Sequence, residues 1–352
     1  MKNLLNVFII VLLPVFSLNS LAQIPDTYYN GTENLSGNEL KTALYNIIKG
    51  HKTFPYTAST TDVWDILKKT DQDTVDTSRV ILLYTGWTRD AAKEYDNENG
   101  WNREHVWAKS HGDFGTFEGP GTDVHALRPC DVSVNTARWN YDFAEGGEIY
   151  VDPDGTTECR RTSNSWEPRD EVKGDVARMI FYMATRYEGE NGEPDLEIVD
   201  YVNSSPNYEP LHGKLSDLYK WHLQDTVSDW ERRRNDIIYY DFQGNRNPYI
   251  DHPEFVDKIW GSLVANEKIS SRLKTTVYPN PFKSFIKIEI DNQYTGKEII
   301  VNLYNINGKK VINLKSTAAI IEIPLKFLEN GAYVLEIIYN KNIVQHKLVV
   351  KN

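Results

Sequence analysis

The run Arg103-Glu104-His105 brings together three side chains that can take part in metal-assisted hydrolysis. A neutral histidine can accept a proton from water near pH 7, and a carboxylate next to it can bind a hard divalent cation. A histidine beside a glutamate is nevertheless common, and most such pairs are ordinary surface or core residues. The pair becomes informative only together with the polar residues that follow it along the chain.

Five further residues have spacings that could bring them to the same place. Asp123 and His125 are two positions apart, so on a strand their side chains point to one face. Asn135 lies where we expect a helix to start, and its amide can turn back toward the strands. Arg128 and Arg138 flank it and can bind phosphate through two parallel hydrogen bonds. Carboxylate, imidazole and amide groups that converge in this way would form a hard-cation site beside a general base.

A strand, a loop, a second strand and a helix must position these residues. Residue patterns predict the strands at 101–107 and 124–127 and the helix at 133–140, with Asp131 or Ser133 as its cap. Apolar residues at helical spacing predict further helices over 35–50, 172–187 and 211–230.

The adjacency of Glu104 and His105 sets a geometric condition. Neighbouring residues of a regular strand point to opposite faces, so both side chains cannot reach one site from its interior. We therefore expect a bulge, or the end of the strand, at these two positions.

Several longer motifs extend this pattern in a fixed order. The chain resembles the His-Me finger, or ββα-metal, nucleases, and in particular the bacterial endonuclease I family, over most of 35–262. The motifs that carry the resemblance are Asn102–Trp107, Thr122–Pro129, Ser133–Arg138, Glu231–Asn235 and Gln243–Pro253.

The resemblance implies an α+β fold with a ββα-metal core and surrounding helices. It implies that His105 is the general base and that Glu104 and Asn135 hold one Mg²⁺, with Mn²⁺ or Ca²⁺ as alternatives. Members cut DNA, and often RNA, to 5′-phosphate ends without sequence specificity. Two positions depart from the family pattern, Ala108 and Ala126.

The remaining roles are less closely fixed by the resemblance. We expect Arg103, Asp123 and His125 to support the site, and Arg128 or Arg138 to stabilise the phosphate. Substrate contacts are expected from Arg232, Arg233 and Arg246. The run Arg232-Arg233-Arg234 also has a plainer interpretation, as a solvated helix face, and 245–253 as a structural loop.

The charge distribution argues against nucleic-acid binding. Residues 23–265 hold 25 lysines and arginines against 43 aspartates and glutamates, whereas 266–352 hold 13 against 7. Affinity for polyanions usually depends on basic patches. The alternative is therefore a catalytically inactive surface or nucleic-acid-binding protein on a nuclease-like scaffold, although Glu104, His105 and Asn135 are all present.

The two ends of the chain indicate export. Residues 1–22 have the basic start, apolar run and small residues of a signal peptide, and no later run is long enough to span a membrane. After a linker at 266–274, residues 275–352 alternate short strands with Asn-Gly turns, which predicts a small all-β sandwich.

The motifs of that last region resemble the sorting domain of the type IX secretion system. The resemblance implies export through the periplasm to the outside or the cell surface; a carbohydrate-binding or adhesive sandwich is the plainer alternative. The motifs are Val277–Phe282, Tyr304–Lys309, Asn330–Tyr333 and Lys347–Lys351.

Two cysteines and three tryptophans complete the expectations. An exported chain with Cys130 and Cys159 as its only cysteines favours one disulfide, with two buried thiols as the alternative. Trp101, Trp107 and Trp139 are expected in the core rather than as base-stacking platforms. We expect a monomer.

Overall fold

The structure, a computed structural model, consists of two compact units. It describes residues 24–203, 208–264, 275–290, 296, 298–339 and 343–352. The predicted signal peptide and the linker lie outside these residues. The first unit ends at Phe255 and mixes helices with short strands, and the second begins at Val256 and is mainly β. This confirms an α+β fold with a C-terminal β region.

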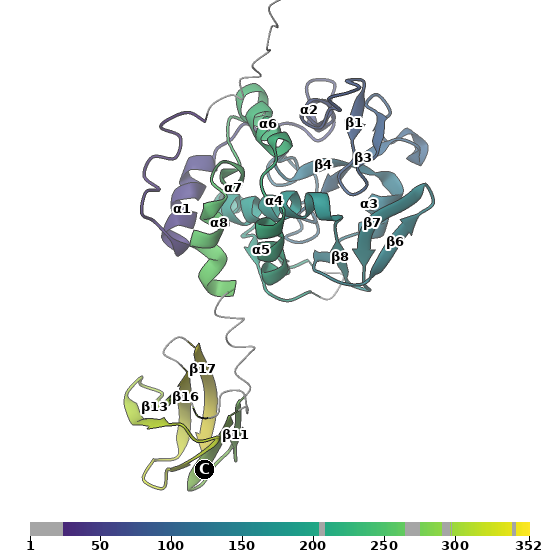
Figure 1. The fold of residues 1–352 in the computed structure, drawn as a ribbon. Helices are drawn as coiled ribbons and strands as arrows, with labels where there is room; N and C mark the ends of the chain where they lie inside the picture. Colours follow the sequence, from purple (N-terminus) through teal and green to yellow (C-terminus); the bar gives the residue numbers. More distant parts are fainter. Residues whose placement is uncertain (1–23, 204–207, 265–274, 291–295, 297, 340–342) are drawn as a thin grey trace, which may run out of the picture. The chain divides into compact units, whose positions relative to one another are not determined.

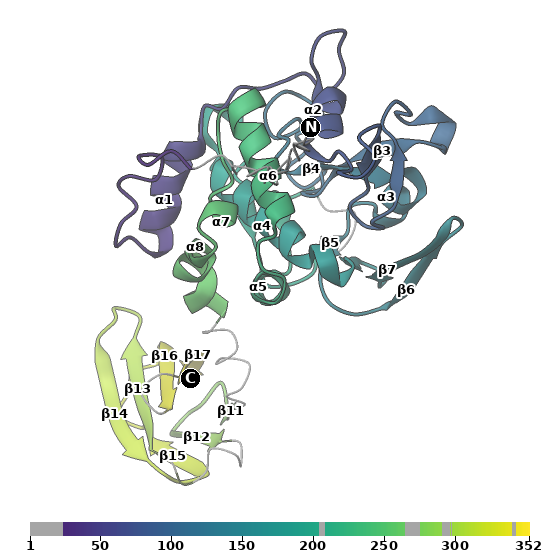
Figure 2. The ribbon, with the colours of Figure 1, turned by 45° about the horizontal axis from the view of Figure 1, so that its top comes forward.

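Helices gather on one side of the first unit, around the central helix α4 (Lys173–Arg186) (Figure 1, Figure 2). Every residue of α4 after Lys173 is buried, because neighbouring helices surround it. No described helix is long and apolar enough to cross a membrane. The other helices of this side are α1 (Gly37–Ile48), α5 (Leu215–Gln224), α6 (Asp229–Ile237), α7 (Pro248–Asp251) and α8 (Glu254–Val256).

The single helix predicted over 211–230 is wrong, because the segment divides into three elements. It begins with the short strand β10 (Leu211–His212), which pairs in parallel with β9 (Glu197–Ile198), and continues as α5. A new helix, α6, then starts at a capping box in which Ser228 Oγ accepts from the Glu231 amide and the Glu231 carboxylate accepts from the Ser228 amide.

The predicted strand-loop-strand-helix order is present on the other side of the unit. Strand β3 (Trp101–His105) pairs antiparallel with β4 (Leu127–Asp131), which runs directly into helix α3 (Val132–Arg138). The Asp131 carboxylate accepts from the Ser133 amide at 3.1 Å, so one residue ends the strand and caps the helix. Helix α3 packs against both strands.

The second strand lies later than the predicted 124–127. Residues before it form a turn in which the Ala126 amide donates to the Asp123 carbonyl at 3.0 Å. Pro129 is tolerated inside β4 because this strand pairs with a strand on one edge only; on its other edge the Pro129 carbonyl accepts from the Leu83 amide at 2.9 Å.

Apolar packing against α2 holds this ββα segment in place. Trp101 and Leu127 join a buried cluster with Val63, Trp64 and Leu67 of α2 (Val63–Thr70). The other strands of this unit are β1 (Arg79–Ile81), β2 (Thr88–Asp90), β5 (Asp142–Phe143), β6 (Glu148–Asp152), β7 (Gly155–Arg161) and β8 (Ser165–Glu167).

The second unit is built from two antiparallel sheets, with strand orders β11-β12-β15 and β14-β13-β16-β17. Isoleucine, leucine and valine from both sheets form one buried cluster. The Asn307-Gly308 turn joins β13 to β14 as a hairpin, with Gly308 at a φ of 75°. The strands are β11 (Thr275–Tyr278), β12 (Phe285–Ile290), β13 (Ile299–Asn305), β14 (Lys310–Ser316), β15 (Ile320–Pro324), β16 (Gly331–Tyr339) and β17 (Ile343–Lys351).

Candidate active site

A cavity of about 460 Å³ lies at the end of β3 and is lined by Glu104, His105 and Asn135. Glu104 and His105 both reach it because β3 ends at His105, whose pairing with Leu127 is the last of the ladder. The predicted strand end is therefore present. Glu104, His105 and Asn135, which were predicted to carry the central chemistry, thus line one cavity.

The contacts of His105 define which of its nitrogens can act as a base. Nε2 lies 3.0 Å from the Gly121 carbonyl oxygen, which can only accept, so Nε2 carries the proton. Nδ1 is then the nitrogen with a free lone pair. Tyr56 stacks on the ring with centroids 5.6 Å apart. Burial lowers the pKa of His105 to about 3, so the imidazole is neutral near pH 7 and can accept a proton.

The Glu104 carboxylate is held through one of its two oxygens. Oε1 accepts from the Tyr84 hydroxyl at 2.6 Å and lies 3.2 Å from Arg138 Nε. No hydrogen bond or ion pair to Oε2 is present in the described part of the chain. Burial raises the pKa of Glu104, and the Arg138 charge and the Tyr84 hydrogen bond oppose that rise.

Asn135 presents an amide oxygen on the same cavity. Its Nδ2 donates to the Arg103 carbonyl at 3.4 Å, which leaves Oδ1 without a bond within the described residues. A carboxylate oxygen and an amide oxygen are hard donors, and Mg²⁺ in proteins commonly has few protein ligands and several waters. The donor set of Glu104 and Asn135 therefore fits Mg²⁺.

Arg103 lines the cavity, but its guanidinium is held by the protein. It stacks between Tyr56 and Trp64, with its carbon 3.4 and 4.0 Å from the two ring centres. It also donates to the Tyr56 carbonyl and to Thr57 Oγ1. This packing fixes the start of the Arg103-Glu104-His105 motif, and the supporting role of Arg103 stays a prediction.

The two arginines expected to stabilise phosphate do not line the cavity. Arg128 is buried, with Nε 2.6 Å from Asp71 and Nη1 3.2 Å from Asp175. Arg138 is buried beside Glu104 and donates to the carbonyls of Val106 and Trp139. Carboxylates and carbonyls already bind both guanidinium groups, so this arrangement does not bring either to a phosphate.

Asp123 and His125 also lie outside the cavity lining, in a buried hydrogen-bonded network. The Asp123 carboxylate accepts from the hydroxyls of Tyr182 and Tyr187 at 2.8 and 2.9 Å. His125 Nε2 lies 3.1 Å from the Asn245 carbonyl oxygen. The prediction that both sit on the second strand is wrong, because they belong to the turn before β4.

The arginines expected to contact substrate have three different surroundings, none of them in the cavity lining. Arg246 is buried and bonded to Asp236 and Asp251. Arg232 and Arg233 are partly exposed on α6 and donate to main-chain carbonyls. The two remain available to a polyanion, whereas Arg246 is an internal ion-pair residue.

Lys109 and Trp139 line the cavity and were not among the predicted site residues. Lys109 is exposed and has no ion pair within the described residues. Trp139 is 56% exposed, so its predicted core position is wrong, whereas Trp101 and Trp107 are buried as expected. It directly follows α3, where its backbone φ of 53° ends the helix. Lys109 follows His105 by four residues in the sequence, so its place near the site could have been predicted.

The predicted disulfide is contradicted, because Cys130 and Cys159 are both free and buried. The Cys159 thiol donates to the Tyr84 carbonyl at 3.2 Å. Burial raises the pKa of both thiols, which keeps them protonated. The alternative of two buried thiols describes the structure.

Comparison with known proteins identifies the family of the chain. Residues 36–254 match the endonuclease I family, and 276–351 match a secretion-system C-terminal sorting domain. The chain is 54% identical over 235 residues to the extracellular ribonucleases of Bacillus subtilis and Bacillus amyloliquefaciens, covering 67% of this chain and 78% of each relative. The sorting domain makes this a secreted or cell-surface protein. By its family match and its relatives, the chain belongs to the endonuclease I family and is a nuclease.

Proposed function

We propose that this chain is a metal-dependent endonuclease that cuts DNA and RNA without sequence specificity and leaves 5′-phosphate ends. The observation that carries the proposal is that Glu104, His105 and Asn135 line one cavity. The extracellular ribonucleases that it resembles support RNA as a substrate. The ββα segment formed by β3, β4 and α3 has the layout expected of a ββα-metal core.

In this proposal His105 removes the proton from the attacking water through Nδ1. The Gly121 carbonyl holds Nε2, so the ring has the tautomer that this step needs. Glu104 and Asn135 would hold the divalent cation, which when bound supplies positive charge to the phosphate and the leaving oxygen. Arg138 is a positioning residue, because it holds Glu104 Oε1.

Substrate contacts come from residues that the structure leaves exposed. Lys109 can pair with a backbone phosphate at the cavity. Trp139 offers an aromatic face to an unpaired base, and such stacking is worth about 1–3 kcal/mol per base. The partly exposed Arg232 and Arg233 would add phosphate contacts on α6. These cations can thus bind nucleic acid although residues 23–265 carry a net negative charge.

Export is the other part of the proposal. Residues 1–22 would be removed as a signal peptide, and the C-terminal unit would direct the chain from the periplasm through the type IX machinery.

Plasmid nicking and RNA cleavage, each with and without Mg²⁺, test the chemistry. His105→Ala should lower the rate by at least the ~10²–10⁴-fold typical of a general base, while the affinity for Mg²⁺ stays near that of the natural chain. His252→Ala is the matched control, since His252 is partly exposed and pairs with Glu254. Cleavage by His105→Ala at the unchanged rate would contradict the proposed role. A natural chain that is inactive at every metal concentration would favour the inactive scaffold.

A further inference from the structure

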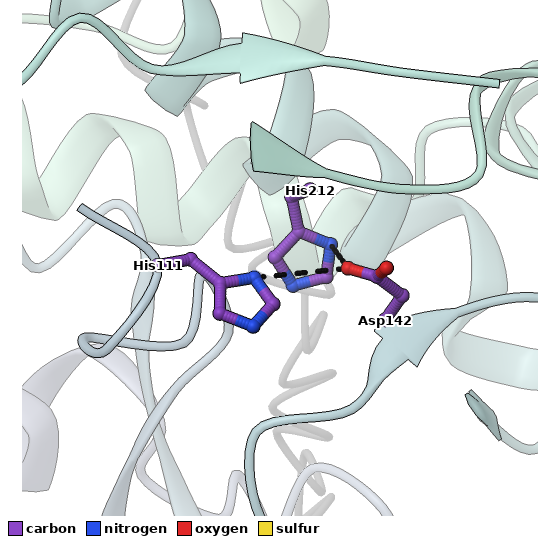
Figure 3. Close-up of side chains that lie close together, drawn as sticks. All are labelled: His111, Asp142 and His212. Carbon is purple, nitrogen blue, oxygen red and sulfur yellow. Dashed lines mark ion pairs between the residues drawn. The ribbon is translucent and has the colours of Figure 1, made fainter. Parts of the chain in front are cut away.

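Three buried residues outside the cavity lining point toward one another: His111, Asp142 and His212 (Figure 3). One nitrogen or oxygen atom from each lies within 4.8 Å of the others. They come from the segment after β3, from β5 and from β10, so they are distant in sequence. None of them belongs to the motifs that the sequence singled out.

The distances in this group exceed those of ordinary hydrogen bonds. Asp142 Oδ1 lies 3.7 Å from His111 Nδ1 and 3.3 Å from His212 Nδ1. Around a tetrahedral Zn²⁺, bonds of about 2.0–2.1 Å separate neighbouring ligand atoms by about 3.3 Å. The separation between Asp142 and His212 matches this spacing, and the separation between Asp142 and His111 is 0.4 Å longer.

His111 Nδ1 is a buried polar atom without a hydrogen-bond partner among the described residues. The residue is 1% exposed, and this nitrogen has no hydrogen bond among the described residues. Leaving a buried polar atom without a hydrogen-bond partner destabilises the folded chain. A cation between Nδ1 and the Asp142 carboxylate would give Nδ1 a partner and would add a second bond to Asp142 Oδ1, which already accepts from the Gly213 amide.

His51 and Asp123 show how the protein satisfies a similar pair without a cation. Their closest atoms are also 3.7 Å apart. There, however, the carboxylate oxygen accepts from Tyr182 and Tyr187, and His51 Nδ1 accepts from Arg186 Nε at 3.1 Å. In the His111 group, Arg138 Nη2 lies 3.5 Å from His212 Nε2, but among the described residues no side chain outside the group donates to Asp142 Oδ1 or bonds His111 Nδ1.

Other contacts hold the group in a fixed orientation. Asp142 Oδ2 accepts from the amide and the side chain of Asn203 at 2.6 and 2.8 Å, and Oδ1 accepts from the Gly213 amide. Phe143 stacks on the His212 ring. Metal ligands are commonly oriented by such outer hydrogen bonds. No lysine or arginine in the described part of the chain pairs with the Asp142 carboxylate.

We propose that His111, Asp142 and His212 bind one Zn²⁺ ion, separate from the cation at Glu104 and Asn135. Two imidazole nitrogens and one carboxylate oxygen suit Zn²⁺ better than Mg²⁺. Without an ion, His212 Nδ1 donates to the Gly213 carbonyl oxygen at 3.0 Å, because a carbonyl oxygen can only accept; zinc would take the place of that proton. The ion would tie the segment after β3 to β5 and β10, and so brace one wall of the cavity.

Zinc binding at Nδ1 puts the proton of His212 on Nε2. Arg138 Nη2 lies 3.5 Å from that atom but donates to the Val106 carbonyl at 2.8 Å. The guanidinium therefore keeps its hydrogen bond when Nε2 is protonated.

Metal analysis of the full chain, purified without chelator, tests the proposal. We expect one equivalent of zinc in the natural chain and in the Glu104→Ala/Asn135→Ala double variant. His111→Gln should lose the zinc, whereas His51→Gln should keep it as the matched control. If the natural chain contains zinc but cuts no nucleic acid, the proposed function is wrong and the zinc site is supported.

Thermal unfolding gives a readout that needs no variant. Chelation should lower the Tm, and Zn²⁺ but not Mg²⁺ should restore it, because a ligand that binds only the folded state stabilises that state. Replacing zinc with Co²⁺ should give visible absorption in the natural chain and none in His111→Gln. A natural chain that takes up no zinc on dialysis, or equal zinc in His111→Gln, would overturn the proposal.

Discussion

The cavity and the ion-pair network around Asp71 use the same kinds of side chain in opposite ways. At the cavity, Glu104 and Asn135 keep oxygen atoms without a bond among the described residues. In the network, Arg128 and Arg234 both pair with Asp71, through Nε atoms 2.6 and 3.2 Å from its oxygens. Charged groups that are already paired inside the protein support the fold. Groups left with unused donor or acceptor capacity mark the site for chemistry.

Arg128→Ala tests the network side of this comparison and should have the largest effect. It leaves Asp71 and Asp175 without a shared cation in the core, and breaking a buried ion pair typically costs about 3–5 kcal/mol. Urea unfolding measures the loss, with the exposed Arg160→Ala as control. We expect the cleavage rate per folded molecule to stay within twofold. A lower rate at unchanged stability would instead give Arg128 the phosphate role that the sequence suggested.

Asn135→Ala tests the cavity side. Loss of a metal ligand should reduce cleavage at low Mg²⁺ by at least about tenfold, and raised Mg²⁺ should recover part of it. The side chain makes one 3.4 Å hydrogen bond, so the free energy of unfolding should change by less than about 1 kcal/mol. Thr136→Ala, which also lines the cavity, is the control. A rate defect that does not depend on Mg²⁺ concentration would count against a ligand role.

His125→Gln tests a buried residue outside the cavity through the pH dependence of the free energy of unfolding. Burial lowers the pKa of His125 to about 4, although Asp123 opposes the shift, and His51 and Arg234 also face the ring. The unfolded chain therefore binds a proton between about pH 6.5 and 4 that the folded chain does not, and stability falls as the pH is lowered through this range. One such proton contributes about 1.4 kcal/mol per pH unit.

In His125→Gln the free energy of unfolding should depend less steeply on pH, because the contribution of about one proton is lost. Urea unfolding between pH 4.5 and 7 measures the slope, with His252→Gln as the partly exposed control. An unchanged slope would mean that His125 has the same pKa in the folded and the unfolded chain.

Removal of the C-terminal unit should have the smallest effect on chemistry. All residues proposed for catalysis lie before Phe255, where the first unit ends. A chain that ends at Val264 should cut DNA within twofold of the full-length rate but should not be exported from its host. Insolubility of the shortened chain would show that the boundary is misplaced.

The sequence was most informative where chemistry and local structure coincide. Glu104, His105 and Asn135 stand close to strand and helix signals, and Asp131 is a helix cap in the pattern as in the structure. The roles of the three cavity residues stay predictions. Their convergence was accessible because it depends on one short ββα segment.

Predictions that depended on distant partners were less reliable. Arg128 looked available for phosphate because its partner Asp71 lies far away in the sequence. The turn before β4 depends on tertiary contacts such as the bond from the Val124 amide to Gln243, which no local pattern shows. The His111, Asp142 and His212 group was missed for the same reason, since three separate segments must meet to form it.

The exposed position of Trp139 also gives the protein an optical property. Trp101, Trp107, Trp166 and Trp221 are fully buried, so water-soluble quenchers should reach their indoles poorly. Iodide should quench Trp139 first, and a nucleic acid seated on the cavity should shield it. In a His105→Ala background, where cleavage is slow, the fluorescence lost in Trp139→Phe would then report substrate occupancy directly, before any bond is cut.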